Sequence, residues 1–191
     1  MPNWKINKTA EELFELPLSS EAERMQKLHG LNILGRQASP QVSDLVECTA
    51  RFFRTPVGFF SVLDEDTQHL YSRFGVSLKQ TPRDIAFCDH TIKARTPMII
   101  DNAAEDERFR HNPLVTQAPS IRFYAGAPVI IDNWFAIGSL CIVDTKPRSL
   151  TPNNVRMLGH FASILSVILE HEFQLPNRLL DGMRHVRGKV D

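Results

Sequence analysis

The sequence lacks an excess of charge of either sign. Its 191 residues include 22 Lys and Arg against 22 Asp and Glu, which leaves a formal net charge of zero at pH 7. Without a net positive field, nothing steers the chain towards a phosphate backbone or an anionic membrane surface. We therefore expect no nucleic-acid partner.

Long hydrophobic runs are also absent. No stretch approaches the roughly 18 apolar residues that a membrane-spanning helix needs, and residues 1–25 contain no apolar segment of the signal-peptide type. We expect a cytoplasmic protein with no membrane partner. Hydrophobic residues make up 42% and charged residues 23% of the chain, as in an ordinary globular domain.

Cysteine is scarce, and the three present are widely spaced: Cys48, Cys88 and Cys141. An odd, scattered set does not indicate a secreted disulfide scaffold, so we predict reduced thiols. Only Cys88 and His90 form a local pair of metal ligands, whereas a zinc site needs four. No Gly-rich phosphate loop, Ser-His-Asp order or paired acidic motif occurs. We predict no metal, no cofactor and no catalytic residue, and expect binding rather than catalysis.

Helix starts are clearly marked. Each has a Ser or Thr cap followed by Pro, or by Glu three residues later, and they lie at Ser20-x-x-Glu23, Ser39-Pro40 and Thr151-Pro152. The apolar stripe over residues 155–169 is wider than one packing surface requires, which predicts a partner helix.

Five strand-like runs lie between these helices, at residues 57–63, 68–74, 97–101, 123–131 and 135–144. Hairpin-length loops join the first two runs and the last two. The pattern predicts an α+β fold with a largely antiparallel sheet and helices on its faces. We divide the chain into an N-terminal extension (1–18), one domain (19–172) and a mobile C-terminal tail (173–191).

Five sequence segments, in the same order as in the family, resemble the GAF domains of bacterial signalling proteins. These are of the sensory type found with diguanylate cyclases and histidine kinases. The five segments are "FFSVLDEDTQHLYSRFGV", "TPRDIAFCDHTI", "DERFRHNPLV", "IRFYAGAPV" and "IGSLCIVDTKPRSLTPNNVRML". The resemblance implies a PAS-like central antiparallel sheet of five or six strands. Terminal helices would cover one face, and pocket loops with short helices would cover the other.

The resemblance also implies a ligand pocket bordered by the long segment 88–119. Its expected ligand-binding residues are Phe87, Cys88, His90, Asp106, Arg108, Phe109, Asn112, Arg122 and Tyr124. Guanidinium groups at Arg108 and Arg122 suit a carboxylate or phosphate, so we expect an unknown small molecule that is anionic or polar.

Each of these residues also has a structural interpretation. Asp106 and Arg108 can form a local ion pair, Phe109 can fill the core, and Asn112 can start a turn. For His90, the packing interpretation and the ligand-contact interpretation carry about equal weight. We expect Arg83 to hold the strand-to-helix turn, with Asp84 capping the helix.

The spacing of Cys88 and His90 argues against a catalytic pair. Helical side chains two positions apart point about 200° apart and do not face each other. We therefore predict Cys88 to be a small buried residue. Cys48 and Cys141 are also interpreted as core.

Two alternatives stay open within the family. A free methionine-(R)-sulfoxide reductase using Cys88 matches the cysteine count, but Cys48 and Cys141 are expected too far away to resolve a disulfide. A bilin photosensor needs a Cys-His pair, which Asp89 interrupts. The main prediction is a non-enzymatic sensory domain that signals through the terminal helices of a homodimer to an output protein.

Overall fold

The computed structural model describes residues 17–187, with side chains described for residues 17–173. Helices and strands follow in the order α2 (Glu21–Leu31), α3 (Pro40–Phe52), β1 (Val57–Leu63), β2 (Thr67–Phe74), β3 (Gln80–Pro82), α4 (Phe87–Thr91), β4 (Met98–Ile100), α5 (Pro113–Thr116), β5 (Phe123–Ile131), β6 (Phe135–Asp144) and α6 (Pro152–Arg187).

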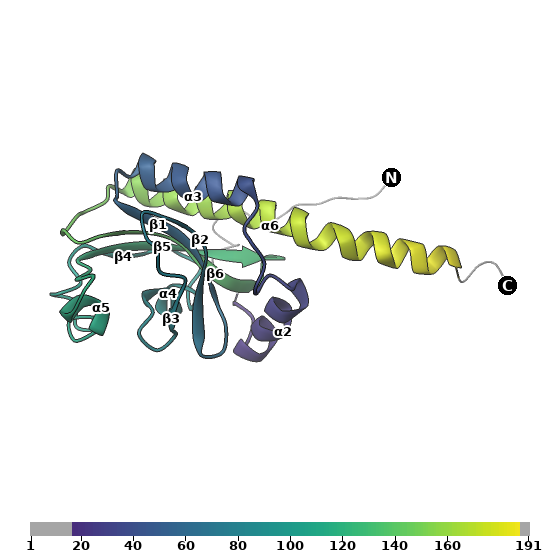
Figure 1. Ribbon diagram of the computed structural model, residues 1–191, viewed down its shortest axis with the longest axis horizontal. Helices are drawn as coiled ribbons and strands as arrows, with labels where there is room; N and C mark the ends of the chain where they lie inside the picture. Colours follow the sequence, from purple (N-terminus) through teal and green to yellow (C-terminus); the bar gives the residue numbers. More distant parts are fainter. Residues whose placement is uncertain (1–16, 188–191) are drawn as a thin grey trace.

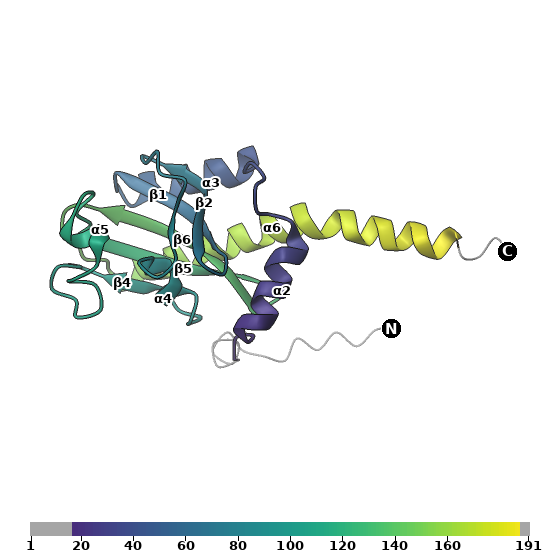
Figure 2. The same cartoon turned by 60° about the horizontal axis from the view of Figure 1, so that its bottom comes forward.

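A six-stranded antiparallel sheet in the order β3-β2-β1-β6-β5-β4 forms the centre of the molecule. Helices α3 and α6 lie on one face of the sheet, while α4 and α5 lie towards the other (Figure 1). Figure 2 shows α2 beside one end of the sheet and separate from α4 and α5. The predicted α+β class and layer order are confirmed.

The central strands have two buried faces, so their sequences are nearly continuous apolar runs. Phe123 and Ile142 belong to the core beneath α3 and α6. Tyr124 and Cys141, one residue along each strand, belong to a second core on the opposite face. Because strand side chains alternate, the same two strands contribute to both cores.

Helices α2 and α3 begin at the predicted caps. Ser20 and Glu23 form the reciprocal capping box, and the Ser39 hydroxyl accepts a hydrogen bond from the backbone of Val42. The backbone of Asn154 donates to Thr151 Oγ1 at the start of α6. No helix in the part that the structure describes combines the length and apolar character needed to span a membrane.

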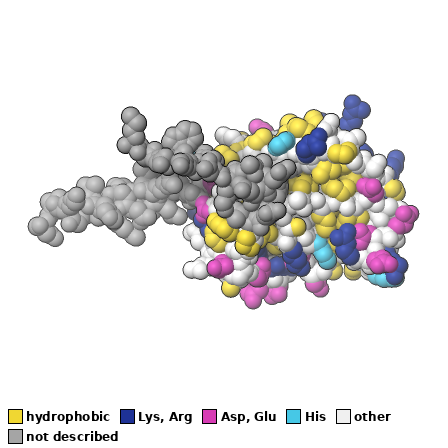
Figure 3. Space-filling view, turned by 180° about the vertical axis from the view of Figure 1, so that it is seen from behind, with side chains coloured by type: hydrophobic (Ala, Val, Ile, Leu, Met, Phe, Trp, Pro, Cys, Tyr) yellow, Lys and Arg dark blue, Asp and Glu magenta, His cyan; other side chains and the backbone are white. Residues whose placement is uncertain are grey.

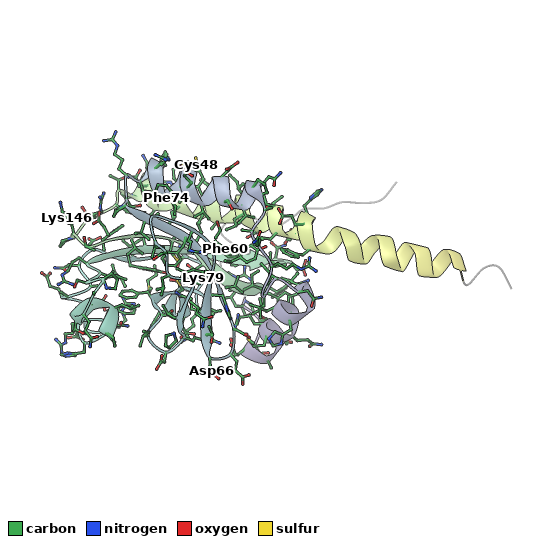
Figure 4. All side chains as sticks on the ribbon, viewed as in Figure 1. Cys48, Phe60, Asp66, Phe74, Lys79 and Lys146 are labelled. Atoms are coloured by element: carbon green, nitrogen blue, oxygen red, sulfur yellow. The ribbon has the colours of Figure 1, made fainter. Side chains whose placement is uncertain are left out.

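Two side chains, one on α3 and one before α4, differ from the predictions. Cys48 is exposed on α3 and lies on the outer side of that helix (Figure 4), because it falls beside the buried stripe. Asp84 does not cap α4, since Ala86 is the N-cap and makes no side-chain hydrogen bond. Helix α6 extends as far as Arg187, and the division into domain and tail at residue 173 stays a prediction.

Candidate functional site

An aromatic cluster lies against the sheet face opposite α3 and α6. Phe87 from α4 stacks on Phe109 with ring centroids 4.1 Å apart, and its ring lies 5.1 Å from that of Tyr124 on β5. All three side chains are buried. The structure therefore brings these predicted ligand-binding residues together, and their rings pack against one another.

A buried polar network surrounds the Tyr124 hydroxyl. That hydroxyl lies 2.7 Å from Thr91 Oγ1 and 3.2 Å from Cys141 Sγ, and it donates to Cys88 Sγ at 3.4 Å. Burial, followed by the two neighbouring cysteines, raises the pKa of Tyr124 well above its usual value. The tyrosine therefore stays protonated and supplies a hydrogen bond inside the apolar core.

The two buried cysteines face each other across this network. Cys88 Sγ and Cys141 Sγ are 3.2 Å apart, so the expectation that Cys141 lies too far away is wrong. Burial raises the pKa of Cys88, but hydrogen bonds from Cys141, Tyr124 and Ser139 outweigh burial and lower it overall. Burial and the neighbouring Cys88 raise the pKa of Cys141 well above its usual value.

Three predicted residues lie at the rim of the cluster. The Arg108 guanidinium forms a salt bridge of 2.7 Å with Asp106, and its charge lies over the Phe109 ring. The His90 ring packs edge-on against Phe109, and burial followed by the charge of Lys93 lowers the pKa of His90. These contacts match the structural interpretation of Asp106 and Arg108, and they leave the exposed part of His90 facing solvent.

The other two predicted residues hold the segment around α5. Asn112 caps α5 through Leu114 N, and its side-chain amide donates to the carbonyl of Ile85. Arg122 Nη1 donates to the carbonyls of Val115 and Ile121. Both side chains therefore hold backbone in place, and ligand contact by these residues stays a prediction.

An ion-pair network closes the outer side of α4. The Arg83 guanidinium contacts Asp89 and Glu21, each at 2.7 Å, and donates to the carbonyl of Asp64. Arg24, whose side chain is 4% exposed, also pairs with Glu21. The hydrogen bond from Arg24, with that from Arg83, outweighs partial burial and lowers the pKa of Glu21 to about 2. Arg83 holds the strand-to-helix turn, as the sequence indicated.

A cavity of about 120 Å³ lies on the same sheet face, beneath α5. Its walls are mainly apolar, from residues such as Phe59, Leu70 and Ile121. Four polar residues also line it: Gln68, Thr81, Asp144 and Thr145. Sequence reasoning missed this cavity. A signal was present, because Gln68 alternates with Leu70 and therefore shares its buried face.

No cluster of three or more His, Cys, Asp or Glu side chains placed to hold a metal ion occurs among the described residues. This side of the sheet carries two thiols, a tyrosine hydroxyl and a mainly apolar cavity.

Comparison with known proteins finds one curated relative by sequence and several solved structures with a similar fold. A cyclic di-GMP phosphodiesterase of Pseudomonas aeruginosa is 35% identical over 146 residues, which is 76% of this chain and 25% of that protein. This chain thus spans about a quarter of the length of the curated relative it matches.

Two solved structures share the fold. The blue-light absorbing form of the PixJ GAF domain of Thermosynechococcus elongatus has 12% identity and a TM-score of 0.61, covering 87% of this chain and 99% of that one. The free methionine-R-sulfoxide reductase of Neisseria meningitidis has 13% identity and a TM-score of 0.60, covering 85% and 99%.

These comparisons contradict the prediction of a non-enzymatic domain. The curated relative is named as a phosphodiesterase, and one of the matching folds belongs to a reductase. The absence of a familiar catalytic motif was too weak a reason to exclude activity, because the close thiol pair is assembled from α4 and β6 and has no local sequence signature. The family model for the GAF domain matches residues 37–169, more than half of the chain, and the chain therefore belongs to the GAF domain family.

Proposed function

We propose that this GAF domain is a sensory module that binds a small molecule on the α4 and α5 side of its sheet. Binding would shift the sheet against α3 and α6 and so change how these helices pair with those of a second copy. Ligand control of this kind requires that the ligand bind one helix arrangement more tightly than the other.

Three exposed hydrophobic side chains on α3 and α6 carry this proposal. Phe52 is 49%, Ile164 48% and Val167 65% exposed. Phe52 contacts Phe161 edge-on, so α3 and α6 lie side by side at this point. Figure 3 shows hydrophobic side chains gathered in patches between charged groups on the side seen from behind. An apolar surface on two helices suits pairing with the same surface of another copy.

The sheet connects the two sides directly. Tyr124 and Phe123 are neighbours on β5, one in the aromatic cluster and the other beneath α6. The other end of β5 is tied to α6, because Ser166 Oγ accepts from Ile130 N at 3.2 Å and Glu170 Oε1 accepts from Asp132 N at 2.7 Å. A displacement of β5 by a ligand would therefore reach α6 without crossing a flexible segment.

The output partner is proposed from the curated relative. Because this chain matches a quarter of a cyclic di-GMP phosphodiesterase, we infer that it regulates an output module of that signalling class. Helix α6, which extends well beyond the sheet in Figure 1, is the element placed to carry the signal.

Sedimentation velocity tests the pairing surface. We expect the wild type to be a dimer and both Val167→Asp and Ile164→Asp to be monomers with unchanged circular dichroism, because a buried carboxylate without a partner is costly. Trp134→Asp, at a side chain 42% exposed outside α3 and α6, is the matched control and should stay dimeric. A monomeric wild type would overturn the proposal.

The close cysteine pair favours a second candidate function, reduction of free methionine sulfoxide. The Cys88 thiolate would attack the sulfoxide sulfur and take its oxygen, which gains a proton from water, leaving a sulfenic acid on Cys88 and releasing methionine. The Cys141 thiol would then attack the Cys88 sulfur, forming a disulfide and releasing water. The 3.2 Å separation supports the disulfide step. Because Cys88 is buried, the first step requires α4 to move and expose it.

Turnover of free methionine-(R)-sulfoxide with dithiothreitol as reductant tests this second candidate. Cys88→Ser should abolish turnover, whereas Cys48→Ser, at the exposed thiol on α3, should leave it unchanged. Equal turnover by Cys88→Ser and wild type would exclude the mechanism.

A further inference from the structure

We propose that the outer edge of β2 is a docking site for an acidic, extended segment of a partner protein, which would add to the sheet as a further strand. In the sheet order β3-β2-β1, strand β3 pairs only with residues 67–69 of β2. Leu70 N donates to Lys79 O, which is the last backbone hydrogen bond on that side of β2 in the described part of the chain. Strand β2 continues to Phe74, so the outer side of residues 71–74 has no neighbouring strand.

An open groove of about 740 Å³ follows this edge. It is lined by residues 69–73 of β2, by the linker 34–38 between α2 and α3, and by Val76 and Lys79 from the segment after β2. The Tyr71 hydroxyl donates to Gln37 O at 3.2 Å and so holds the linker beside the strand. Clefts that bind ligands usually measure about 300–1,000 Å³. The groove is therefore large enough for the side chains of a short segment.

The groove lining carries positive charge and no negative charge. Arg36, Arg73 and Lys79 line it, and no Asp or Glu does so. None of the three forms an ion pair with another described residue. Glu172, which does not line the groove, accepts a hydrogen bond from Ser39. Because the chain has no net charge, these three cations are a local excess, and they favour carboxylates in an occupant.

The same charges argue against a second copy of this chain at this edge. Two β2 edges paired together would bring like charges from Arg73 and Lys79 close to each other, which destabilises strand pairing. Charged side chains at a sheet edge commonly prevent such self-association. An acidic strand is attracted instead. Backbone hydrogen bonds to β2 would supply affinity, and the carboxylates would supply selectivity.

This docking site goes beyond the proposed sensory function. None of the residues that support helix pairing or sulfoxide reduction lines the groove. The two proposals can therefore fail independently.

A fluorescent heptapeptide of alternating valine and glutamate is the probe. Its valines favour an extended strand, and its glutamates offer carboxylates to the three cations. We expect saturable binding in fluorescence anisotropy, with an affinity that falls as salt is added. Amide hydrogen exchange within residues 71–74 should slow on binding, because the open edge of β2 becomes hydrogen-bonded.

Altered peptides separate charge from strand addition. A peptide of alternating valine and lysine reverses the charge and should bind at least about tenfold more weakly. Two further glutamate peptides carry N-methyl groups on every valine amide or on every glutamate amide. Both keep the charge, and each blocks one edge of the added strand. The peptide whose blocked edge faces β2 should bind about tenfold more weakly than the unmethylated one.

Charge reversal on the protein tests where the peptide binds. Arg73, Lys79 and Lys146 are all exposed, so their replacement should leave the fold intact. We expect Arg73→Glu and Lys79→Glu each to weaken binding of the glutamate peptide about five- to tenfold and to strengthen binding of the lysine peptide. Lys146→Glu is the matched control, at a lysine apart from Lys79 in Figure 4, and should bind like the wild type.

Several results would overturn the docking site. These are absence of saturable binding of the glutamate peptide, and equal loss of binding in Lys79→Glu and Lys146→Glu. Undiminished binding of both N-methylated peptides would overturn strand addition. Exchange protection of residues 71–74 that rises with protein concentration, without peptide, would assign the edge to a second copy. NMR shifts along the groove with inorganic phosphate, but none with the peptide, would assign it to small anions. Either assignment would overturn the acidic segment as occupant, and sedimentation velocity would still decide helix pairing separately.

Discussion

Tyr124 shows how one side chain organises the site face of this domain. Its ring belongs to the aromatic cluster, while its hydroxyl bonds Thr91 and contacts both buried thiols. Space for that hydroxyl depends on Gly126, two residues along β5, because a Cβ there would lie 2.1 Å from it. The backbone of β5, the strand that also contacts α6, therefore leaves the space that the Tyr124 hydroxyl needs.

Removing the Tyr124 hydroxyl should leave the Thr91 hydroxyl buried without its closest partner. We expect Tyr124→Phe to lower the free energy of unfolding by about 1–3 kcal/mol. Thr91→Val should cost a similar amount, and the double variant should cost less than the sum, since both polar groups are then absent. Urea unfolding of the four proteins measures the coupling. Additive costs would show that the two hydroxyls do not depend on each other.

The three cysteines should differ sharply in reactivity towards a thiol reagent. Cys48 is exposed, whereas Cys88 and Cys141 are buried. We expect one thiol to react rapidly with Ellman's reagent in the folded protein and all three after denaturation, because alkylation and exchange need access to the thiolate. Cys48→Ser should remove the rapid reaction. A second rapidly reacting thiol would show that α4 opens readily and exposes Cys88.

At the scale of elements, α2 is held to the turn before α4 by Glu21, which pairs with Arg24 and Arg83. The pKa of Glu21 is lowered from 4.5 to about 2. The pairing therefore stabilises the fold above the unfolded value of 4.5 and is lost as the pH falls towards 2. Since Glu21 is 54% exposed, solvent screening keeps this contribution below about 1 kcal/mol.

Glu21→Gln should therefore reduce stability at neutral pH and flatten its dependence on acid. We expect the urea midpoints of wild type and variant to differ at about pH 6 and to approach each other as the pH falls from about 4.5 to about 2, where the carboxylate of the folded wild type protonates. Glu65→Gln, at an exposed carboxylate in the β1–β2 hairpin, is the control and should follow the wild type. A constant difference between Glu21→Gln and wild type at all pH values would contradict this account.

The elements themselves were largely predictable, whereas the contacts between them were not. Runs 57–63, 123–131 and 135–144 coincide with β1, β5 and β6, because apolar periodicity and turn residues fix them locally. Strand β3 was missed, since three residues carry no periodic signal. The meeting of Cys88 with Cys141 and the pairing of Gln68 with Thr81 depend on sheet register and helix docking, which no local pattern encodes.

At the scale of the whole molecule, the sheet separates two surfaces with different chemistry. One side carries the aromatic cluster, the thiol pair and the cavity, and the other carries α3 and α6 with their exposed hydrophobic side chains. Strands β5 and β6 are shared by both cores. A ligand and a second copy would therefore act on the same strands from opposite faces, which is the arrangement that coupling between two sites requires.

If pairing through α3 and α6 stabilises the folded chain, thermal stability should depend on protein concentration. Mass action predicts that the Tm of a dimer rises as the protein is concentrated, because the partner binds the folded state and not the unfolded one. We expect this rise for the wild type and for Trp134→Asp, measured by differential scanning calorimetry over a hundredfold dilution series. Val167→Asp should show a lower Tm that does not change with concentration, since its carboxylate prevents association. A wild-type Tm independent of concentration would show that the exposed side chains on α6 do not support a dimer that stabilises the fold.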